Sequence, residues 1–269
     1  MKKFILKSIL VVLSFITIVA CGDKKDSTGA LKIGVMSGPE FALAEVAKKV
    51  AKEKYNLDVE LITFNDYIVP NEALNQGDLD ANAYQTKPFL DSQSEQRGYK
   101  LAVNGNTFVY PIVGYSKKIK SLNELKDGST IAIPNDAPNG GRSLILLNKL
   151  GLIKLKDGVG LFPKLTDIVG NPKKLDIIEL EAPQLTRVLD DEKVVIAVIN
   201  NNFAGQAGLD VAQNGVFTED KESPYVNLIV SIEDNKNDPR IKQFVQAYQS
   251  AEVEQKAKEV FKGGAVKGW

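Results

Sequence analysis

The stretch Asp80–Tyr115, DANAYQTKPFLDSQSEQRGYKLAVNGNTFVYPIVGY, sets the organisation of the chain. Its first half places two aromatic residues, Tyr84 and Phe89, on either side of a polar Gln-Thr-Lys segment. Its second half, Asn106–Tyr115, is apolar, β-branched and aromatic, which is typical of a strand. We therefore predict that the first half walls a ligand site and that the second half crosses between two lobes.

The first folded part of the chain predicts a βαβ unit. Leu31–Met36 and Val59–Phe64 have the patterns of strands, and Phe41–Lys54 between them carries apolar residues at helical spacing. Two strands joined in this way lie parallel, and ligands of such sheets bind beyond the carboxyl ends of the strands. The loops 37–40 and 65–67 leave those ends, so both are candidate ligand contacts.

Strand and helix patterns alternate again in the middle of the chain. A second apolar run, Tyr225–Ser231, is predicted to be the partner of the first crossing strand. Arg240–Phe261 then predicts two helices that are separated near Ser250. The predicted strands of the middle part are Thr130–Pro134, Leu175–Leu180 and Val194–Ile199, and its predicted helices are Arg142–Leu150, Lys164–Val169 and Gln184–Asp190.

These elements predict an α/β protein of two lobes joined by two crossing strands. Lobe 1 is expected to comprise residues 31–106 and 232–269, and lobe 2 to comprise residues 107–231, including the crossing strands. Two α/β lobes that close around a ligand are the architecture of periplasmic-binding-protein-like folds. The predicted fold class is therefore a two-lobed fold of this kind, of type II.

The N-terminus has the pattern of a lipoprotein signal peptide. A basic start is followed by the apolar run Ile9–Val19 and then by Ala20 and Cys21. This arrangement resembles a bacterial lipobox, which implies cleavage after residue 20 and a lipid on Cys21. An uncleaved anchor or a plain secretory peptide is the alternative. Residues 21–29 are expected to be the lipidated cysteine and a flexible tether, which would hold the folded part outside the cytoplasm at a membrane of the cell envelope.

Composition excludes several classes of function. The chain has 34 basic and 34 acidic residues, and loss of the three lysines of the leader leaves 31 against 34. A mildly acidic body argues against nucleic acid as a partner. The absence of histidine excludes histidine metal sites and every nucleophile–histidine pair, and Cys21 is the single cysteine. We expect no metal, no cofactor and no enzymatic activity.

Arg142 is the strongest single candidate for ligand binding. It follows the loop NDAPNGG and is predicted to open a helix, where backbone N–H groups and the helix dipole favour an anion. A guanidinium can also bind a carboxylate with two hydrogen bonds. The alternative is a surface arginine on the first turn of the helix.

Aromatic and amide side chains form the rest of the candidate site. Tyr67, Tyr84 and Phe89 suit a cleft for a small ligand, although packing in the core is the alternative for each. Asn200 follows a buried strand and Asn227 interrupts an apolar one, so each must be hydrogen-bonded, either to a ligand or to the backbone. The two asparagines after Asn200 are expected to cap the next helix.

Long motifs across the mature chain resemble the NlpA/MetQ family of lipoproteins, the substrate-binding components of methionine ABC importers. The matching stretches are LDANAYQTKPFLD, GYKLAVNGNTFVYPIVGYSKKIKSL, IAIPNDAPNGGRSLILL, GLIKLKDGVGL, IIELEAPQLTRVLDD, ESPYVNLIV and FKGGAVKGW. The resemblance implies a two-lobed fold that closes on a free amino acid, normally L-methionine. It also implies permease and ATPase subunits as partners.

The resemblance further implies roles for individual residues. Arg142 would bind the carboxylate of the substrate. Asn139 beside it would also belong to the site, although its match to the family is weaker. Asn200 and Asn227 would hydrogen-bond the backbone groups of the amino acid. The three aromatic residues of the candidate site would enclose the thioether, since sulfur makes favourable contacts with aromatic rings.

The chain departs from the family pattern in two places. Thr86 stands where the family usually has a pocket histidine, which removes a donor and leaves room for water or a larger ligand. The loop 137–142 reads Ala-Pro-Asn-Gly-Gly-Arg where the family usually reads Pro-Thr-Asn-Leu-Gly-Arg. Alternative ligands are therefore another apolar amino acid or a methionine-containing dipeptide. A surface lipoprotein or adhesin that binds another protein is an alternative of a different class.

Overall fold

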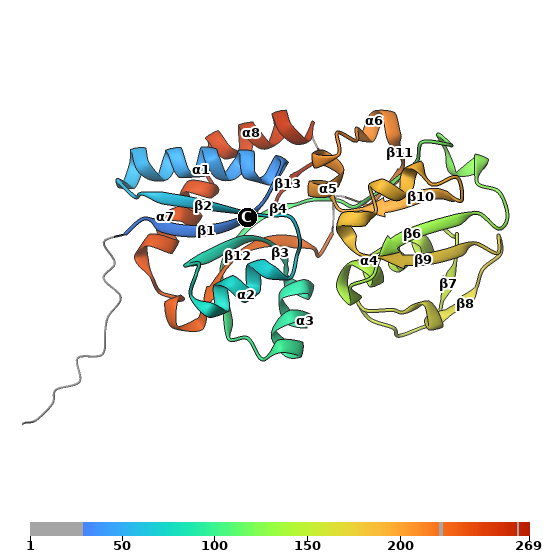
Figure 1. The fold of residues 1–269 in the computed structure, drawn as a ribbon, viewed down its shortest axis with the longest axis horizontal. Coiled ribbons are helices and arrows are strands. Elements are labelled where there is room, and N and C mark those ends of the chain that lie inside the picture. Colours follow the sequence, from blue (N-terminus) through green and yellow to red (C-terminus); the bar gives the residue numbers. More distant parts are fainter. Residues whose placement is uncertain (1–28, 221–222, 263) are drawn as a thin grey trace, which may run out of the picture.

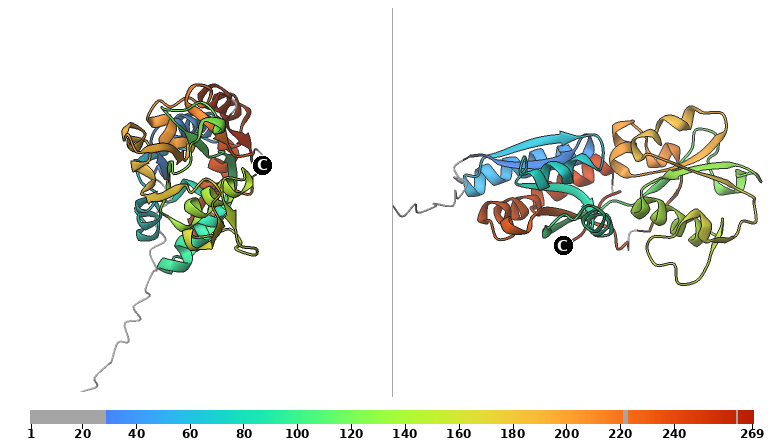
Figure 2. Two further views of the ribbon diagram at one scale, coloured as in Figure 1. Left: turned by 90° about the vertical axis from the view of Figure 1, so that its right-hand side faces the viewer. Right: turned by 60° about the horizontal axis from the view of Figure 1, so that its bottom comes forward.

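The computed structural model describes residues 29–220, 223–262 and 264–269. The predicted leader, Cys21 and the tether up to residue 28 lie outside the described residues. Two α/β lobes lie side by side along the longest axis of the molecule (Figures 1 and 2). Each lobe has its own sheet, which confirms the predicted two-lobed α/β fold class.

The first lobe is built on a six-stranded sheet in the order β13-β4-β12-β3-β1-β2. The predicted βαβ unit is present, because β1 pairs in parallel with both β2 and β3, while β12 is antiparallel to β3 and β4. The strands are β1 (Leu31–Met36), β2 (Val59–Phe64), β3 (Ala81–Thr86), β4 (Leu101–Val109), β12 (Val226–Ile232) and β13 (Val266–Lys267). The carboxyl ends of β1 and β2 thus open at one edge of the sheet, as the sequence predicts.

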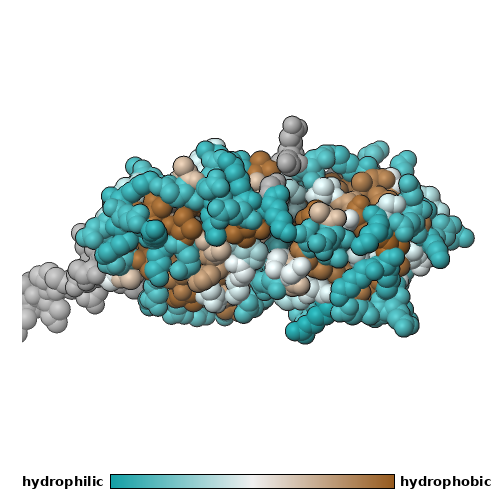
Figure 3. Space-filling view, turned by 90° about the horizontal axis from the view of Figure 1, so that it is seen from above, coloured by the Kyte–Doolittle hydropathy of each residue, from teal (hydrophilic) through white to brown (hydrophobic). Residues whose placement is uncertain are grey.

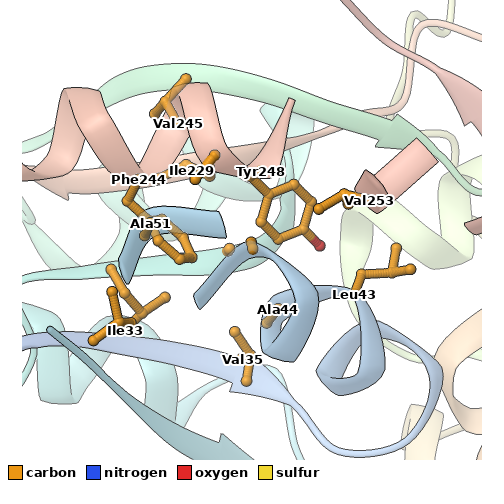
Figure 4. Close-up of a cluster of buried hydrophobic side chains, with 14 of the residues drawn as sticks. Ile33, Val35, Leu43, Ala44, Ala51, Ile229, Phe244, Val245, Tyr248 and Val253 are labelled. Atoms are coloured by element: carbon orange, nitrogen blue, oxygen red, sulfur yellow. The ribbon is translucent and has the colours of Figure 1, made fainter. Parts of the chain in front are cut away.

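Helices cover both faces of this sheet. The helices α1 (Pro39–Tyr55), α7 (Pro239–Tyr248) and α8 (Ala251–Phe261) lie on one face, and α2 (Val69–Gln76) and α3 (Lys87–Arg97) lie on the other (Figure 1). In Figure 4, apolar side chains of α1 and α7 converge over the strands. Phe244 and Tyr248 of α7 are fully buried there, together with Leu43 and Ala44 of α1. The predicted break near Ser250 is confirmed, since the Ser250 hydroxyl accepts the Val253 N–H and begins α8.

The second lobe has a five-stranded sheet in the order β11-β5-β10-β6-β9. The strands are β5 (Val113–Tyr115), β6 (Thr130–Pro134), β9 (Asp176–Leu180), β10 (Val194–Ile199) and β11 (Gly215–Thr218). The helices are α4 (Ala137–Lys149), α5 (Asn201–Gln206) and α6 (Val211–Asn214), and β7 (Lys154–Leu155) pairs with β8 (Ile168–Gly170) in a separate small sheet. Leu144 and Leu147 of α4 pack on Ile131 and Ile133 of β6, so α4 is held against the sheet by a buried apolar face.

The chain passes between the sheets at residues 110–112 and again between β11 and β12. The first crossing was predicted, but Tyr225–Ser231 is not the second one. Almost all of that run belongs to β12, which lies between β3 and β4 inside the first sheet. Its largely apolar character reflects two strand neighbours and a buried position. Residues 107–109 and 226–231 were expected in the second lobe. The sheets place them in the first lobe instead.

A short C-terminal strand, β13, holds the end of β4 just before the first crossing. β13 pairs with the end of β4, and the Gly268 N–H donates to the Thr107 carbonyl at 3.0 Å. The Asn106 amide donates to the Gly268 carbonyl at 2.9 Å, and the rings of Trp269 and Phe108 meet edge to face with centroids 5.0 Å apart. The strand just before the crossing is thereby fixed by the end of the chain.

Three predicted helices differ in the structure. α4 begins at Ala137, not at Arg142, because the Asp136 carboxylate caps it by accepting the Asn139 N–H at 2.9 Å and a proline occupies its first turn. The segments 164–169 and 184–190 form only 3₁₀ turns, with β8 following the first of them. Both segments are short and contain β-branched residues, which weakens an isolated helix.

The surface in Figure 3 is mostly hydrophilic. Hydrophobic areas on both lobes are interrupted by polar and charged residues, as is ordinary for a protein surface. Among the described residues, no helix is both long enough and apolar enough to cross a membrane.

Candidate functional site

The structure brings all eight predicted site residues to one cavity between the lobes. They are Tyr67, Tyr84, Thr86, Phe89, Asn139, Arg142, Asn200 and Asn227. Five residues outside this predicted set also line it: Glu40, Gln85, Tyr110, Asn201 and Asn202. In the first lobe the lining comes from the start of α1, the loop after β2, the end of β3, the start of α3 and β12. In the second lobe it comes from α4, α5 and the residue before α5, and the first crossing completes it. In Figure 1, α4 and α5 lie on the side of the second lobe that faces the first.

Aromatic rings form one wall of the cavity. The ring centroid of Tyr67 lies 6.0 Å from that of Tyr84 and 5.8 Å from that of Phe89. Phe203 of α5 reaches this cluster from the other lobe, with its centroid 5.0 Å from that of Tyr67. The Tyr84 hydroxyl donates to the Tyr67 carbonyl at 2.9 Å and so fixes the loop after β2. Burial raises the pKa of Tyr67 and of Tyr84 well above the ordinary value, so both phenols stay neutral.

Thr86 has a local role besides lining the cavity. It is the N-cap of α3, and its hydroxyl accepts the Phe89 N–H at 3.4 Å. The threonine at this position therefore helps to hold the first turn of α3, which carries an aromatic residue of the wall. A cap of this kind can be predicted from Thr86-Lys87-Pro88, because proline favours the first turn of a helix.

A buried amide network supports the wall from behind. Gln85 donates to Asn71 at 2.7 Å and to Asn82 at 2.9 Å. Asn71 donates back to Gln85 at 2.8 Å, and Asn82 donates to Asn71 at 2.9 Å. All three side chains are buried, and together they tie α2 to β3. Such a network is rigid because each buried amide has its partners within it.

Arg142 lies in the second turn of α4, so the predicted role of a helix N-terminus at this residue was wrong. Two glycines in the first turns let α4 approach its neighbours closely. A Cβ at Gly140 would lie 2.7 Å from the Pro134 carbonyl oxygen, and one at Gly141 would lie 2.7 Å from the Leu161 carbonyl oxygen. The glycines that suggested a loop are therefore packing positions inside a helix, and α4 carries Arg142 into the cavity.

Glu219 holds the guanidinium of Arg142 in place. The Arg142 Nε donates to Glu219 Oε1 at 3.0 Å, and the Arg142 Nη2 pairs with Glu219 Oε2. The same Nη2 donates to the Tyr110 carbonyl at 3.0 Å, and the Tyr225 ring lies 4.3 Å from the guanidinium carbon. Arg142 is only 3% exposed. A buried charge needs such a partner. The two hydrogen bonds to Glu219 use Nε and Nη2, so Nη1 takes no part in this pair.

Glu219 also joins the two crossings. Its N–H donates to the Ile112 carbonyl at 2.9 Å, and its carboxylate accepts the Ile112 N–H at 3.4 Å. Arg142 is thus connected to both chain segments that run between the lobes. Glu219 was not predicted from the sequence, because its role depends on a partner 77 residues away in the chain.

A chain of hydrogen bonds orients Asn200. The Asp136 carboxylate accepts from Asn139 Nδ2 at 2.8 Å, and Asn139 Oδ1 accepts from Asn200 Nδ2 at 2.8 Å. Asp136 can only accept while it is ionised, so each amide has one orientation that satisfies the chain. Asn200 Oδ1 is then left as a buried acceptor without a partner among the described residues. Because Asn200 lines the cavity, this oxygen is available to a ligand.

Two further amides present one free group each. Asn227 donates to the Tyr84 carbonyl at 2.9 Å, so the predicted alternative of a backbone bond is realised and its Oδ1 remains as an acceptor. Asn202 Oδ1 accepts from the Tyr67 hydroxyl at 2.5 Å across the lobes. Its Nδ2 is buried and has no partner in the described part of the chain. Neither Asn202 nor the residue before it caps α5, because the N-cap position is Asn200.

Glu40 is the second charged residue of the lining, after Arg142. It lies in the first turn of α1 and is 4% exposed. Burial raises its pKa to about 8. The sequence places Glu40 in a loop beyond the carboxyl end of β1, which is the signal that could have identified it. No group of three or more potential metal ligands occurs among the residues that the structure describes.

Two α/β lobes that meet over a polar and aromatic cavity define a substrate-binding protein with a periplasmic-binding-protein fold, and solved structures agree. The crystal structure of the methionine-binding protein MetQ is 66% identical, has a TM-score of 0.88, and covers 89% of this chain and 98% of its own. A nutrient-binding protein from Burkholderia cenocepacia, solved with methionine bound, is 48% identical with a TM-score of 0.86 and covers 89% of this chain and 100% of its own.

Sequence comparison identifies the family. The D-methionine-binding lipoprotein MetQ of Escherichia coli strain K12 is 63% identical over 254 residues, which is 94% of each chain. The profile of the NlpA lipoproteins matches residues 31–269. This chain belongs to the NlpA lipoprotein family, which confirms the resemblance seen in its motifs.

Proposed function

We propose that this protein is the receptor of an amino-acid ABC importer and that it binds methionine between its lobes. The observation that carries the proposal is the division of one cavity into an aromatic part and a polar part. Tyr67, Tyr84 and Phe89 would enclose an apolar side chain that contains sulfur. The polar part, which includes Arg142 and Asn200, would bind the groups common to all amino acids.

The polar part offers both kinds of hydrogen-bonding group that a zwitterion needs. Arg142 Nη1 and Asn202 Nδ2 are donors, which suit a carboxylate. Asn200 Oδ1 and Asn227 Oδ1 are acceptors, which suit an ammonium group. Donors and acceptors that remain after the internal hydrogen bonds are counted would thus match the two ends of a free amino acid.

Calorimetry on protein freed of ligand by unfolding and refolding tests the ligand. We expect tight binding of methionine and at least tenfold weaker binding of leucine, because leucine lacks the thioether. L-methionine, D-methionine and a glycyl-methionine dipeptide are measured in parallel, since relatives are named for the D enantiomer. Heat with leucine and none with either enantiomer of methionine would replace methionine as the ligand and keep the class.

Arg142 variants test the polar end. Arg142→Lys keeps the charge next to Glu219 but loses the planar fork, so we expect a folded protein that binds methionine at least tenfold more weakly. The matched control is Lys149→Arg. Lys149 lies on the same helix as Arg142 and forms an exposed pair with Asp220, so this variant should bind as the unaltered protein does. Equal affinity of the Arg142 variant would remove this residue from the site.

The importer and the anchor belong to the same proposal. A lipid on Cys21 would hold the receptor at the membrane, and the closed, loaded lobes would dock on permease and ATPase subunits. Mass spectrometry of the protein extracted from membranes should show acyl groups on an N-terminal cysteine. Cys21→Ala should abolish acylation and release the folded part from the membrane fraction.

A further inference from the structure

The start of α1 lies where the two lobes meet. Gln206 of α5 donates to the Ser37 carbonyl at 2.7 Å, from one lobe to the other. Gly38 has φ of +90°, and a Cβ there would lie 2.6 Å from the Gln206 side chain. Pro39 packs against Gly205 of α5, where a Cβ would lie 2.3 Å from the proline ring. The backbone that carries Glu40 is therefore fixed by contacts with both lobes.

The Glu40 carboxyl is buried without a protein partner. It forms no hydrogen bond and no ion pair with any residue in the described part of the chain, although it is 4% exposed and lines the cavity. A carboxylate in this position would be an uncompensated buried charge, which proteins rarely tolerate. The Arg142 charge does not compensate it, because that guanidinium is already paired with Glu219.

We propose that Glu40 binds the ammonium group of the ligand and releases its proton to solvent when the ligand enters. This inference rests on the proposed function, in which the ligand is a free amino acid. Before binding, the carboxyl is a neutral acid. On binding, its O–H bond breaks, the proton leaves to solvent, and the carboxylate accepts N–H hydrogen bonds from the ammonium. The ligand keeps all three ammonium protons, so one proton is released per ligand bound.

The tyrosines that surround Glu40 do not titrate near pH 7. Tyr67, Tyr110 and Tyr248 face it from the loop after β2, the first crossing and α7, and burial raises the pKa of each of them. They therefore stay neutral near pH 7, and the Arg142 guanidinium is already engaged in its pair with Glu219. Burial raises the pKa of Glu40 to about 8, so the acid is protonated at pH 7 until an ammonium replaces the lost hydration.

The predicted linkage has a definite sign. Below pH 8, binding must remove a proton, so affinity should rise with pH by up to about tenfold per unit between pH 6 and 8. Above that pH the carboxylate is already ionised, and affinity should level off until the ammonium of the ligand itself loses its proton. Asn200 Oδ1 and Asn227 Oδ1 do not titrate, so they add affinity without adding this dependence.

Calorimetry of the mature chain with methionine at pH 7, in phosphate and in Tris, counts the protons released. We expect close to one proton per methionine for the unaltered protein and none for Glu40→Gln, whose affinity should fall at least tenfold. Glu45→Gln, on the exposed side of the same helix, is the matched control and should behave as the unaltered protein does. An enthalpy that is independent of buffer in the unaltered protein overturns the inference.

A ligand probe gives a second readout that needs no variant. 4-(Methylsulfanyl)butanoic acid is methionine without its amino group. We expect it to bind the unaltered protein at least a hundredfold more weakly than methionine and to release no proton. If it binds as well as methionine does, Glu40 is not an ammonium site. If methionine itself does not bind the folded protein, the proposed function fails instead, so the two failures can be distinguished.

Discussion

The hydroxyl of Tyr67 donates a hydrogen bond to Oδ1 of Asn202, and the two residues belong to different lobes. Tyr67 lies in the loop after β2, and Asn202 lies in the first turn of α5. The bond therefore forms only while the lobes are together. It also leaves the Asn202 Nδ2 group in the cavity, so closure of the lobes and presentation of a donor occur together.

Tyr67→Phe should weaken ligand binding by about 2- to 10-fold. The change removes one interlobe hydrogen bond and keeps the ring that packs on Phe203, and a net contribution near 1 kcal/mol is usual for such a bond. Calorimetry with methionine measures the effect. Tyr55→Phe, at the far end of α1, is the control. A Tyr67→Phe protein with unchanged affinity would show that this bond does not contribute to the closed state.

Glu219→Gln should lower the free energy of unfolding by about 3 kcal/mol, because it leaves the buried Arg142 charge without its partner. Urea unfolding followed by circular dichroism measures the loss. Asp220→Asn is the neighbouring control: its pair with Lys149 is exposed, so its loss should cost less than about 1 kcal/mol. Equal effects of the two substitutions would contradict the role of Glu219.

Thr86→Ala should cost about 1 kcal/mol of stability, because α3 loses its N-cap hydrogen bond, whereas Thr86→Ser should retain most of it. Thermal unfolding of the ligand-free protein separates the two variants. Ligand affinity should follow the same order, since α3 positions Phe89 in the aromatic wall. An alanine variant as stable as the serine variant would mean that the long 3.4 Å contact is not a functional cap.

The ligand-free protein should lose stability as pH rises from 5 to 8. The folded state holds the Glu40 proton up to about pH 8, whereas the unfolded chain releases it near pH 4.5. The unfolded state therefore binds fewer protons in this range, and stability should fall by about 1.4 kcal/mol per pH unit from this group. Glu40→Gln should remove that slope. Urea unfolding of both proteins at pH 5.5, 6.5 and 7.5 makes the comparison, and parallel slopes would contradict it.

The fold was largely predictable because its signals are local. Leu31–Met36 and Phe41–Lys54 show their own periods, and the helix 87–97 lies between a capping threonine and Gly98. The second crossing was misplaced because a mostly apolar run such as Tyr225–Ser231 is also the pattern of a strand buried inside a sheet. The real connection includes Glu219, whose charge is satisfied only by the tertiary fold.

The site could be predicted as a set of residues but not as a set of contacts. All eight predicted residues line one cavity, while their roles toward a ligand remain predictions. The orientation of Asn200 depends on Asn139 and Asp136, which lie more than 60 positions away in the chain, so no local pattern indicates it. Glu40 was not singled out within its predicted ligand loop, because nothing in the local sequence shows that its carboxyl is buried in the folded protein.

The pairing of β13 with β4 determines where a reporter or a surface linker can be attached to this protein. Gly268 and Trp269 are bound to the strand that leads into the first crossing, and the C-terminus lies beside it (Figure 1). A fluorescent domain or surface linker fused after Trp269 would be attached next to the first crossing and would be sensitive to a change in the arrangement of the lobes. One inserted at the exposed Gly158, where the second lobe turns at φ of +76°, would lie away from both crossings. For a methionine biosensor, the first position is the place for the reporter and the second is the place for immobilisation.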